Sequence, residues 1–222
     1  MRPLLSIATL AALGGVAHAG GGGQVTGVVT VTDPGDKAAT GAEVVIYIVG
    51  PKDVGDKADT STIRQKDRAF VPDLIAVTAG GSVTFPNDDK ILHNVFSQSE
   101  PRKFDLGSFK KGDSKTKEFP KPGVVDVYCN IHPEMAATIL VVPNRFHTRT
   151  NAGGVYTLSD VPPGDWTLFA FTRRAQKPVS QKIHVDAAGQ TKVDLALKRG
   201  EEPDHLNKYG EKYKAGNPTT YR

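Results

Sequence analysis

VYCNIHPEM, residues 127–135, is the stretch that decides the fold, and it spaces a cysteine, a histidine and a methionine at equal intervals of three. Alternating apolar segments lie before it, at 123–129, and after it, at 137–142, so it is expected to connect two strands. Cys129 would then end the first strand, and His132 and Met135 would share a tight loop. The stretch predicts a strand–loop–strand unit that directs a thiolate, an imidazole and a thioether toward one point.

A fourth donor has to come from another part of the chain, and His93 is the candidate because it begins the segment 93–96 after the turn at residues 87–90. Two imidazoles and a thiolate with a weak thioether form a donor set that selects copper and is typical of electron-transfer sites. Zinc would favour a second cysteine or a carboxylate. Each residue alone has an ordinary structural explanation, but Cys129 is the only cysteine and Met135 is the only methionine besides Met1. Together they predict one bound copper ion.

Alternation of apolar and polar residues recurs along the whole chain, whereas we find no eleven-residue window with a sustained helical repeat. The 23 glycines and 15 prolines favour short strands joined by tight turns. The sequence therefore predicts an all-β protein. The expected strands are 25–32, 42–49, 61–65, 74–78, 82–86, 93–96, 114–119, 123–129, 137–142, 154–158, 164–171, 179–185 and 190–197.

Residues 61–143 resemble a cupredoxin. The loop Tyr-Cys-Asn-Ile-His-Pro-Glu-Met is similar to the short ligand loop of the plastocyanin and amicyanin group, and the likeness extends upstream through residues 70–72, 77–85 and 93–94. The resemblance implies a Greek-key sandwich that holds one type 1 (blue) copper ion. It implies that the four ligands are His93, Cys129, His132 and Met135. Asn94 would tie the two ligand loops together from behind the ligands, and an exposed edge of His132 would be the electron exit.

A second resemblance lies in residues 148–168, which look like the second half of a carboxypeptidase-regulatory-like (transthyretin-like) β-sandwich with its Gly-x-Tyr-x-Leu strand and Pro-Pro-Gly turn. The pattern of the first half occurs far upstream, at residues 27–29 and 41–45. We therefore expect residues 24–50 and 146–198 to form one split sandwich. The cupredoxin, residues 51–145, would be inserted in it, because chain ends that lie close together tolerate insertions. The alternative is two domains in series.

The two ends of the chain differ from the domains. Residues 1–19 resemble an export signal, with Arg2, an apolar run and the sequence Ala17-His18-Ala19, so the protein is expected to be periplasmic or secreted. The apolar run is too short to cross about 30 Å of hydrocarbon, and no membrane span is expected. Residues 199–222 are predicted to be a polar tail, either disordered or lying across the surface. His205 is its only candidate ligand and has no suitable neighbour in sequence, so the tail is expected to be dispensable for the site.

Charge and motifs limit the range of possible functions. The net charge is +4, but 28 basic residues alternate with 24 acidic ones, which argues against nucleic acid as a partner. No nucleophile–base pair or catalytic zinc motif is found, so we expect an electron carrier that exchanges electrons with redox partner proteins, and not an enzyme. The alternatives are a periplasmic copper carrier or copper-sensing protein, and a structural β module. One group of basic residues either steers an acidic partner or is simply solvated: Arg102, Lys103, Lys110, Lys111, Lys115, Lys117 and Lys121.

Overall fold

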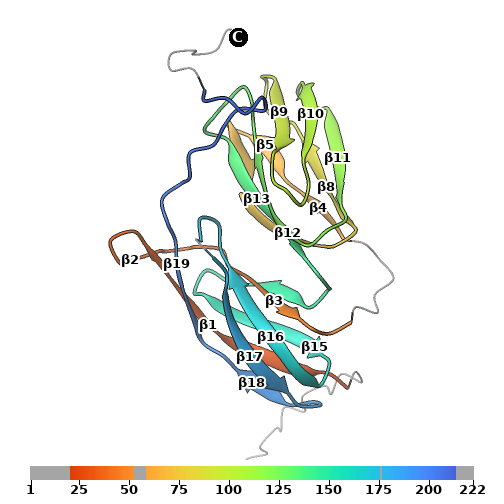
Figure 1. Cartoon of the computed structure of the whole chain (residues 1–222), viewed down its shortest axis with the longest axis vertical. Coiled ribbons are helices and arrows are strands. Elements are labelled where there is room, and N and C mark those ends of the chain that lie inside the picture. The colour runs from red at the N-terminus through yellow and green to blue at the C-terminus, as the bar shows by residue number, and fades with distance from the viewer. Residues whose placement is uncertain (1–20, 53–58, 176, 214–222) are drawn as a thin grey trace, which may run out of the picture.

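The computed structural model describes residues 21–52, 59–175 and 177–213, and this part of the chain contains strands and no helix. The all-β prediction is confirmed. The strands form two units that lie one above the other in Figure 1: a middle unit, residues 59–142, and a flanking unit, residues 21–52 and 143–198. None of the described segments forms a helix suited to crossing a bilayer. The predicted export signal lies outside the described residues.

The middle unit consists of two sheets and a hairpin. The larger sheet has the order β10-β9-β12-β13-β7, with β7 (Leu74–Thr78), β9 (His93–Ser97), β10 (Phe104–Phe109), β12 (Gly123–Tyr128) and β13 (Ala136–Val142). The smaller sheet has the order β11-β8-β4, with β4 (Thr60–Thr62), β8 (Gly81–Pro86) and β11 (Ser114–Phe119). β5 (Arg64–Lys66) and β6 (Ala69–Val71) form the hairpin. Inward-facing residues of the sheets, among them Phe85, Phe119 and Val127, share one apolar core.

The flanking unit consists of two further sheets. In the first, β1 (Gly23–Asp33) lies between β15 (Val155–Val161) and β18 (Gln190–Lys192), and also pairs with β2 (Lys37–Ala38) and β19 (Leu195–Lys198). The second has the order β14-β3-β16-β17, with β3 (Val45–Val49), β14 (His147–Arg149), β16 (Gly164–Phe171) and β17 (Val179–Val185). Within the described residues, β1 and β3 thus pair with strands of this unit alone.

Gly27 shows why the sequence of β1 suits this pairing. It lies opposite Tyr156 of β15, and a Cβ at this position would lie 1.8 Å from the carbonyl oxygen of Val193. Only glycine allows so close a backbone approach. The buried hydroxyl of Tyr156 donates to the same carbonyl oxygen (2.7 Å), so the pairing of β1 and β15 is also tied to the segment before β19.

The two units meet at β13, which is buried on both faces. Ile139 and Val141 belong to the middle core, whereas Leu140 and Val142 belong to a third cluster that also contains Phe171 of β16. A strand buried on both sides is expected to be continuously apolar, as the sequence Ile-Leu-Val-Val of β13 is.

The chain leaves and re-enters the flanking unit at one place. Asn144, in the segment between β13 and β14, is 1% exposed. Its side-chain amide donates to the carbonyl oxygens of Ile48 (3.0 Å) and Pro51 (3.3 Å). One buried side chain therefore joins the outgoing and returning segments.

Candidate metal centre

Three of the predicted ligands lie together. His93 begins β9, Cys129 directly follows β12, and His132 lies on the loop between β12 and β13. Their donor atoms all lie within 4.8 Å of one another. The two histidine Nδ1 atoms are 3.0 Å apart, and Cys129 Sγ is 3.7 Å from His132 Nδ1. All three residues are buried, with exposed fractions of 0%, 0% and 4% for His93, Cys129 and His132.

Met135 completes the loop that carries two of these donors. The N–H of Met135 donates to His132 O (3.0 Å), and the N–H of Cys129 donates to Met135 O (3.2 Å). These two bonds close residues 129–135 into a compact turn. Met135 is 1% exposed and packs in the same apolar cluster as Cys129. Its thioether is the remaining soft donor of the loop.

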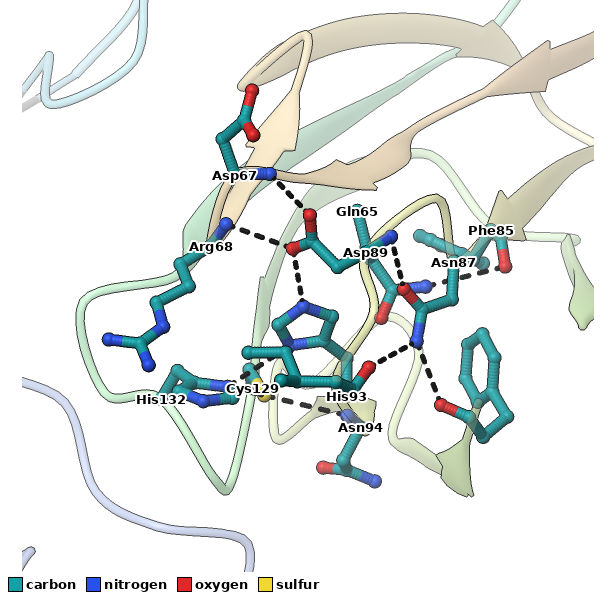
Figure 2. Close-up of polar contacts among 12 residues, drawn as sticks. Gln65, Asp67, Arg68, Phe85, Asn87, Asp89, His93, Asn94, Cys129 and His132 are labelled. Carbon is teal, nitrogen blue, oxygen red and sulfur yellow. Dashed lines mark hydrogen bonds and ion pairs between the residues drawn. The ribbon is translucent and has the colours of Figure 1, made fainter. Parts of the chain in front are cut away.

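The outer nitrogen of His93 is held by a residue that the sequence did not single out. His93 Nε2 lies 2.7 Å from Asp89 Oδ2, on the opposite side of the ring from Nδ1 (Figure 2). The carboxylate therefore accepts a hydrogen bond from Nε2–H. This leaves the lone pair of Nδ1 free to bind a metal, the arrangement found around many metal-bound histidines. Asp89 lies four residues before His93, a spacing that could have indicated the contact. The adjacent Asp88 made the choice between the two carboxylates ambiguous from sequence.

Asp89 is itself fixed by its surroundings. Its carboxylate accepts the N–H groups of Asp67 (2.7 Å) and Arg68 (2.9 Å), from the turn between β5 and β6 (Figure 2). Burial alone would raise the pKa of Asp89, but the hydrogen bonds from Arg68, His93 and Asp67 outweigh it and lower this pKa. Asp89 is therefore a fixed carboxylate at neutral pH.

Asn87 organises the turn that presents Asp89. It is fully buried, and its amide donates to the carbonyl oxygens of Ile91 and Phe109, at 2.9 Å each. Its Oδ1 accepts the N–H of Asp89 (2.9 Å). A buried amide with these hydrogen bonds gives the loop one conformation.

Asn94 connects two segments of the site. Its backbone N–H points at Cys129 Sγ (3.4 Å), and its side-chain Oδ1 accepts the N–H of Asn130 (3.2 Å). The residue after the first histidine thus connects β9 to the loop that carries the other ligands.

The electrostatics suit a neutral His132 imidazole beside a thiol that a cation would deprotonate. Burial raises the pKa of the Cys129 thiol, although the N–H groups of Asn94 and Ile131 act in the opposite direction. Burial also lowers the pKa of His132, and the neighbouring His93 lowers it further. These N–H groups would stabilise a thiolate once a metal replaced its proton.

The donor set fits a copper ion. Bonds of about 2.0 Å to nitrogen and about 2.3 Å to sulfur, the lengths known for zinc, let one ion span donors up to about 4 Å apart. The two pairs that involve His132 Nδ1 meet this condition, and all three donor atoms lie within 4.8 Å of one another. Two imidazoles and a thiolate, with a thioether on the same loop, select copper by softness.

His132 is only 4% exposed and is therefore buried, in contrast to the expectation of an exposed ring edge. The ring packs edge-on against His93, with 4.8 Å between ring centroids. The following residues, Pro133 and Glu134, are exposed and form the surface of the loop in its place.

The described part of the tail follows the second of the two alternatives and lies across the surface. From β19, residues 199–213 run along the side of the molecule to the middle unit and end on the ligand loop (Figure 1). His205 stacks on Tyr128, with centroids 3.9 Å apart, and its Nε2 lies 2.8 Å from Pro133 O. His205 is not part of the ligand cluster, and its contacts are structural ones to β12 and the ligand loop, about 70 residues earlier in the chain. Residues 214–222 lie outside the described part.

Two of the basic residues considered for partner steering have a structural role. The ammonium groups of Lys115 and Lys117 lie over the rings of Phe109 (5.1 Å) and Phe104 (5.8 Å). Each charge is therefore attracted to the face of an aromatic ring. Attraction of an acidic partner stays a prediction.

Among known proteins, only solved structures resemble this chain. No family model matches the chain, and no curated protein matches it. A purple cupredoxin from Nitrosopumilus maritimus is 24% identical over 37% of this chain and 99% of its own, with a TM-score of 0.34. Amicyanin from Paracoccus versutus is 22% identical over 44% and 97%, with a TM-score of 0.34. A copper-containing nitrite reductase from Thermus scotoductus is 26% identical over 42% and 25%, with a TM-score of 0.36.

Proposed function

We propose that this protein holds one copper ion in a type 1 site and carries single electrons between redox partner proteins outside the cytoplasm. The observation that supports this most is the buried cluster of His93, Cys129 and His132, with two imidazole Nδ1 atoms and a thiol sulfur directed at one point. Bound there, copper would supply a Cu(I)/Cu(II) couple. Export also explains why a lone thiol needs an occupant, since free thiols are rare in oxidising compartments.

The chain's own residues hold the donors in place before any ion binds. Asp89 fixes the ring of His93, Asn94 fixes the neighbourhood of the thiol, and the two backbone hydrogen bonds of Met135 fix the loop. A rigid, buried donor set limits how far the ligands move when the charge of the site changes. This is the property that a one-electron carrier requires.

The same geometry argues against substrate chemistry and against copper delivery. Asp89 is hydrogen-bonded to Nε2 of His93, so the fourth donor of the proposed set is Met135. Four protein donors would leave no coordination position open for a substrate. A delivery protein must release its metal to an acceptor, whereas His93, Cys129 and Met135 are at most 1% exposed. Electron transfer is therefore favoured over a copper carrier or sensor.

The ligand set is tested by adding Cu(II) to the purified protein and recording its visible spectrum. We expect an intense thiolate-to-copper band that Cys129→Ser abolishes, because a hydroxyl lacks the donor orbital. Met135→Leu should keep the band and raise the reduction potential, since an axial ligand tunes the potential without holding the ion. An unchanged band in the Cys129 variant would refute the assignment, and loss of copper in the Met135 variant would refute the axial role.

The kind of function is tested by voltammetry of the copper-loaded protein. A reversible one-electron couple supports electron transfer. A protein that shows no such couple but transfers its copper to an acceptor would be a carrier.

A further inference from the structure

Four side chains from four segments form a closed circuit of hydrogen bonds beside the ligand loop. Asn94 of β9 donates through Nδ2 to Asp105 Oδ1 (2.7 Å), and Asp105 Oδ2 pairs with Lys208 Nζ (2.8 Å). The backbone N–H of Lys208 donates to Asn130 Oδ1 (3.0 Å). The backbone N–H of Asn130 donates to Asn94 Oδ1 (3.2 Å), which closes the circuit. Lys208 is the one member of this circuit that comes from the tail.

The tail touches the ligand loop at two further points. The hydroxyl of Tyr213 donates to the carbonyl oxygen of Cys129 (3.2 Å), and His205 Nε2 lies 2.8 Å from Pro133 O. The tail therefore contacts the loop at the thiol-bearing residue, at the next residue and beyond His132.

The tail is also held independently of the loop. Its root is fixed to the flanking unit, where Arg199 donates to both carboxylate oxygens of Asp33 at 2.8 Å. On the middle unit, the side-chain amide of Gln98 donates to Lys208 O (2.8 Å). A segment fixed in this way can restrain a loop that it contacts.

We propose that the tail acts as a brace for the metal centre through His205, Lys208 and Tyr213, with Lys208 and Tyr213 as positioning residues for the ligand loop. The brace acts on the sulfur through the circuit, because Asn94 both accepts from Asn130 and directs its own N–H at Cys129 Sγ. The side chain of Lys208 supplies the bond to Asp105, whereas its backbone N–H supplies the bond to Asn130. Loss of the side chain therefore opens the circuit at Asp105, the residue that holds the side-chain amide of Asn94. The effect on copper rests on the proposed function, whereas the restraint on the loop does not.

The test compares Lys208→Met with Lys212→Met in the full chain. Lys212 is exposed in the same tail and has no hydrogen bond or ion pair among residues 21–52, 59–175 and 177–213, so it controls for the lost charge. We expect the Lys208 variant to release copper to a chelator about three to ten times faster, the effect of losing one partly exposed hydrogen bond between charged groups. Equal release rates in the two variants would overturn the proposal.

A second pair tests the contact to Cys129. Tyr213→Phe removes the hydroxyl that reaches Cys129. Tyr47→Phe is the control, because Tyr47 stacks on Phe169 in the flanking unit and makes no hydrogen bond through its hydroxyl among the described residues. We expect faster copper release and a shifted visible band in the Tyr213 variant alone. If the Tyr213 and Tyr47 variants match the wild type in both readouts, Tyr213 has no positioning role.

Amide hydrogen exchange in the metal-free protein separates this proposal from the assignment of copper. The N–H groups of residues 129–132 should exchange faster in Lys208→Met than in Lys212→Met, whatever metal the protein binds. A wild type without the thiolate band but with this difference would refute the copper site and keep the brace. Equal exchange would refute the brace, even in a blue protein.

Discussion

A histidine that binds a metal through Nδ1 carries its proton on Nε2, and the group that receives this proton sets the orientation of the ring. For His93 that group is Asp89, which is held by backbone N–H groups of Asp67 and Arg68. Both of these turn residues have positive φ, 54° and 56°, in a two-residue hairpin loop where glycine and asparagine are usual. This unfavourable conformation directs two donors at one carboxylate, and strain of this kind persists where the surrounding structure fixes it.

Replacing Asp89 with Asn should weaken copper binding about 10- to 100-fold, the usual effect of removing a partner of a metal-bound histidine. The amide keeps the shape of the side chain but loses the charge that receives the Nε2 proton. Competition with a copper chelator measures the affinity.

Asp88→Asn is the matched control for this substitution. Asp88 pairs with Arg64 on the surface and makes no contact with His93 among the described residues. Its loss should leave the affinity unchanged. If the two variants bind copper equally well, Asp89 does not position the ligand.

At the scale of strands, prediction from sequence worked where alternation was regular. The bounds of β7, β11, β16 and β17 are those expected from the pattern. β10 was missed because a bulge between Asp105 and Ser108, with Gly107 at φ +67°, breaks the alternation. With the strand, its Asp105 was also missed.

The site shows the same division. His93, Cys129 and His132, which the structure brings together, were identified from residue types and short spacings; their role as copper ligands stays a prediction. Asp89, Asp105 and Lys208 were not identified, because acidic and basic residues are common and only the folded chain shows what they contact. Lys208 is 103 residues from its partner Asp105, a separation that no local pattern reveals.

The root of the tail gives a prediction about pH. The hydrogen bond from Arg199 holds the pKa of Asp33 below its usual value, so the folded state favours the carboxylate more than the unfolded state does. This contribution is present above the unfolded pKa of about 3.9 and is lost as the pH falls through the lower folded value. Asp33→Asn should therefore lower the urea midpoint at pH 7, and the difference from wild type should shrink below pH about 4.

Asp36→Asn serves as the comparison for Asp33. Asp36 pairs with Lys198, and both side chains are 79% exposed, so solvent screens the pair. Its removal should lower the midpoint less at pH 7. A larger loss from Asp36 than from Asp33 would contradict the role assigned to the root of the tail.

At the scale of the whole molecule, the two units share structure. Leu140 and Val142 of β13 pack in one cluster with Val45 and Phe171 of the flanking unit. Arg149 of the flanking unit donates to Leu74 O (2.9 Å), and the tail adds a second connection. Unfolding of one unit therefore exposes apolar surface of the other, which couples their stabilities.

Leu140→Ala should lower the free energy of unfolding by about 2–5 kcal/mol and uncouple the two units. The fluorescence of Trp166, the only tryptophan, reports on the flanking unit, and the thiolate band reports on the middle unit. The two transitions should coincide in the wild type and separate in this variant.

Ile139→Ala is the matched control, because Ile139 is the preceding residue of the same strand and faces the middle core alone. It should lower both transitions by a similar amount without separating them. Transitions that separate already in the wild type, or that stay together in Leu140→Ala, would contradict coupling through this cluster.

The position of the brace late in the sequence also sets an order of assembly. A ribosome makes a chain from its N-terminus, so residues 129–135 exist, and can begin to fold, before residues 205–213 have been made. During that interval the nascent loop lacks its contacts at Cys129, Asn130 and Pro133. A metal that meets the growing chain therefore meets a less restrained loop than one that meets the finished protein. The contacts from residues 205–213 form last and then restrain the loop.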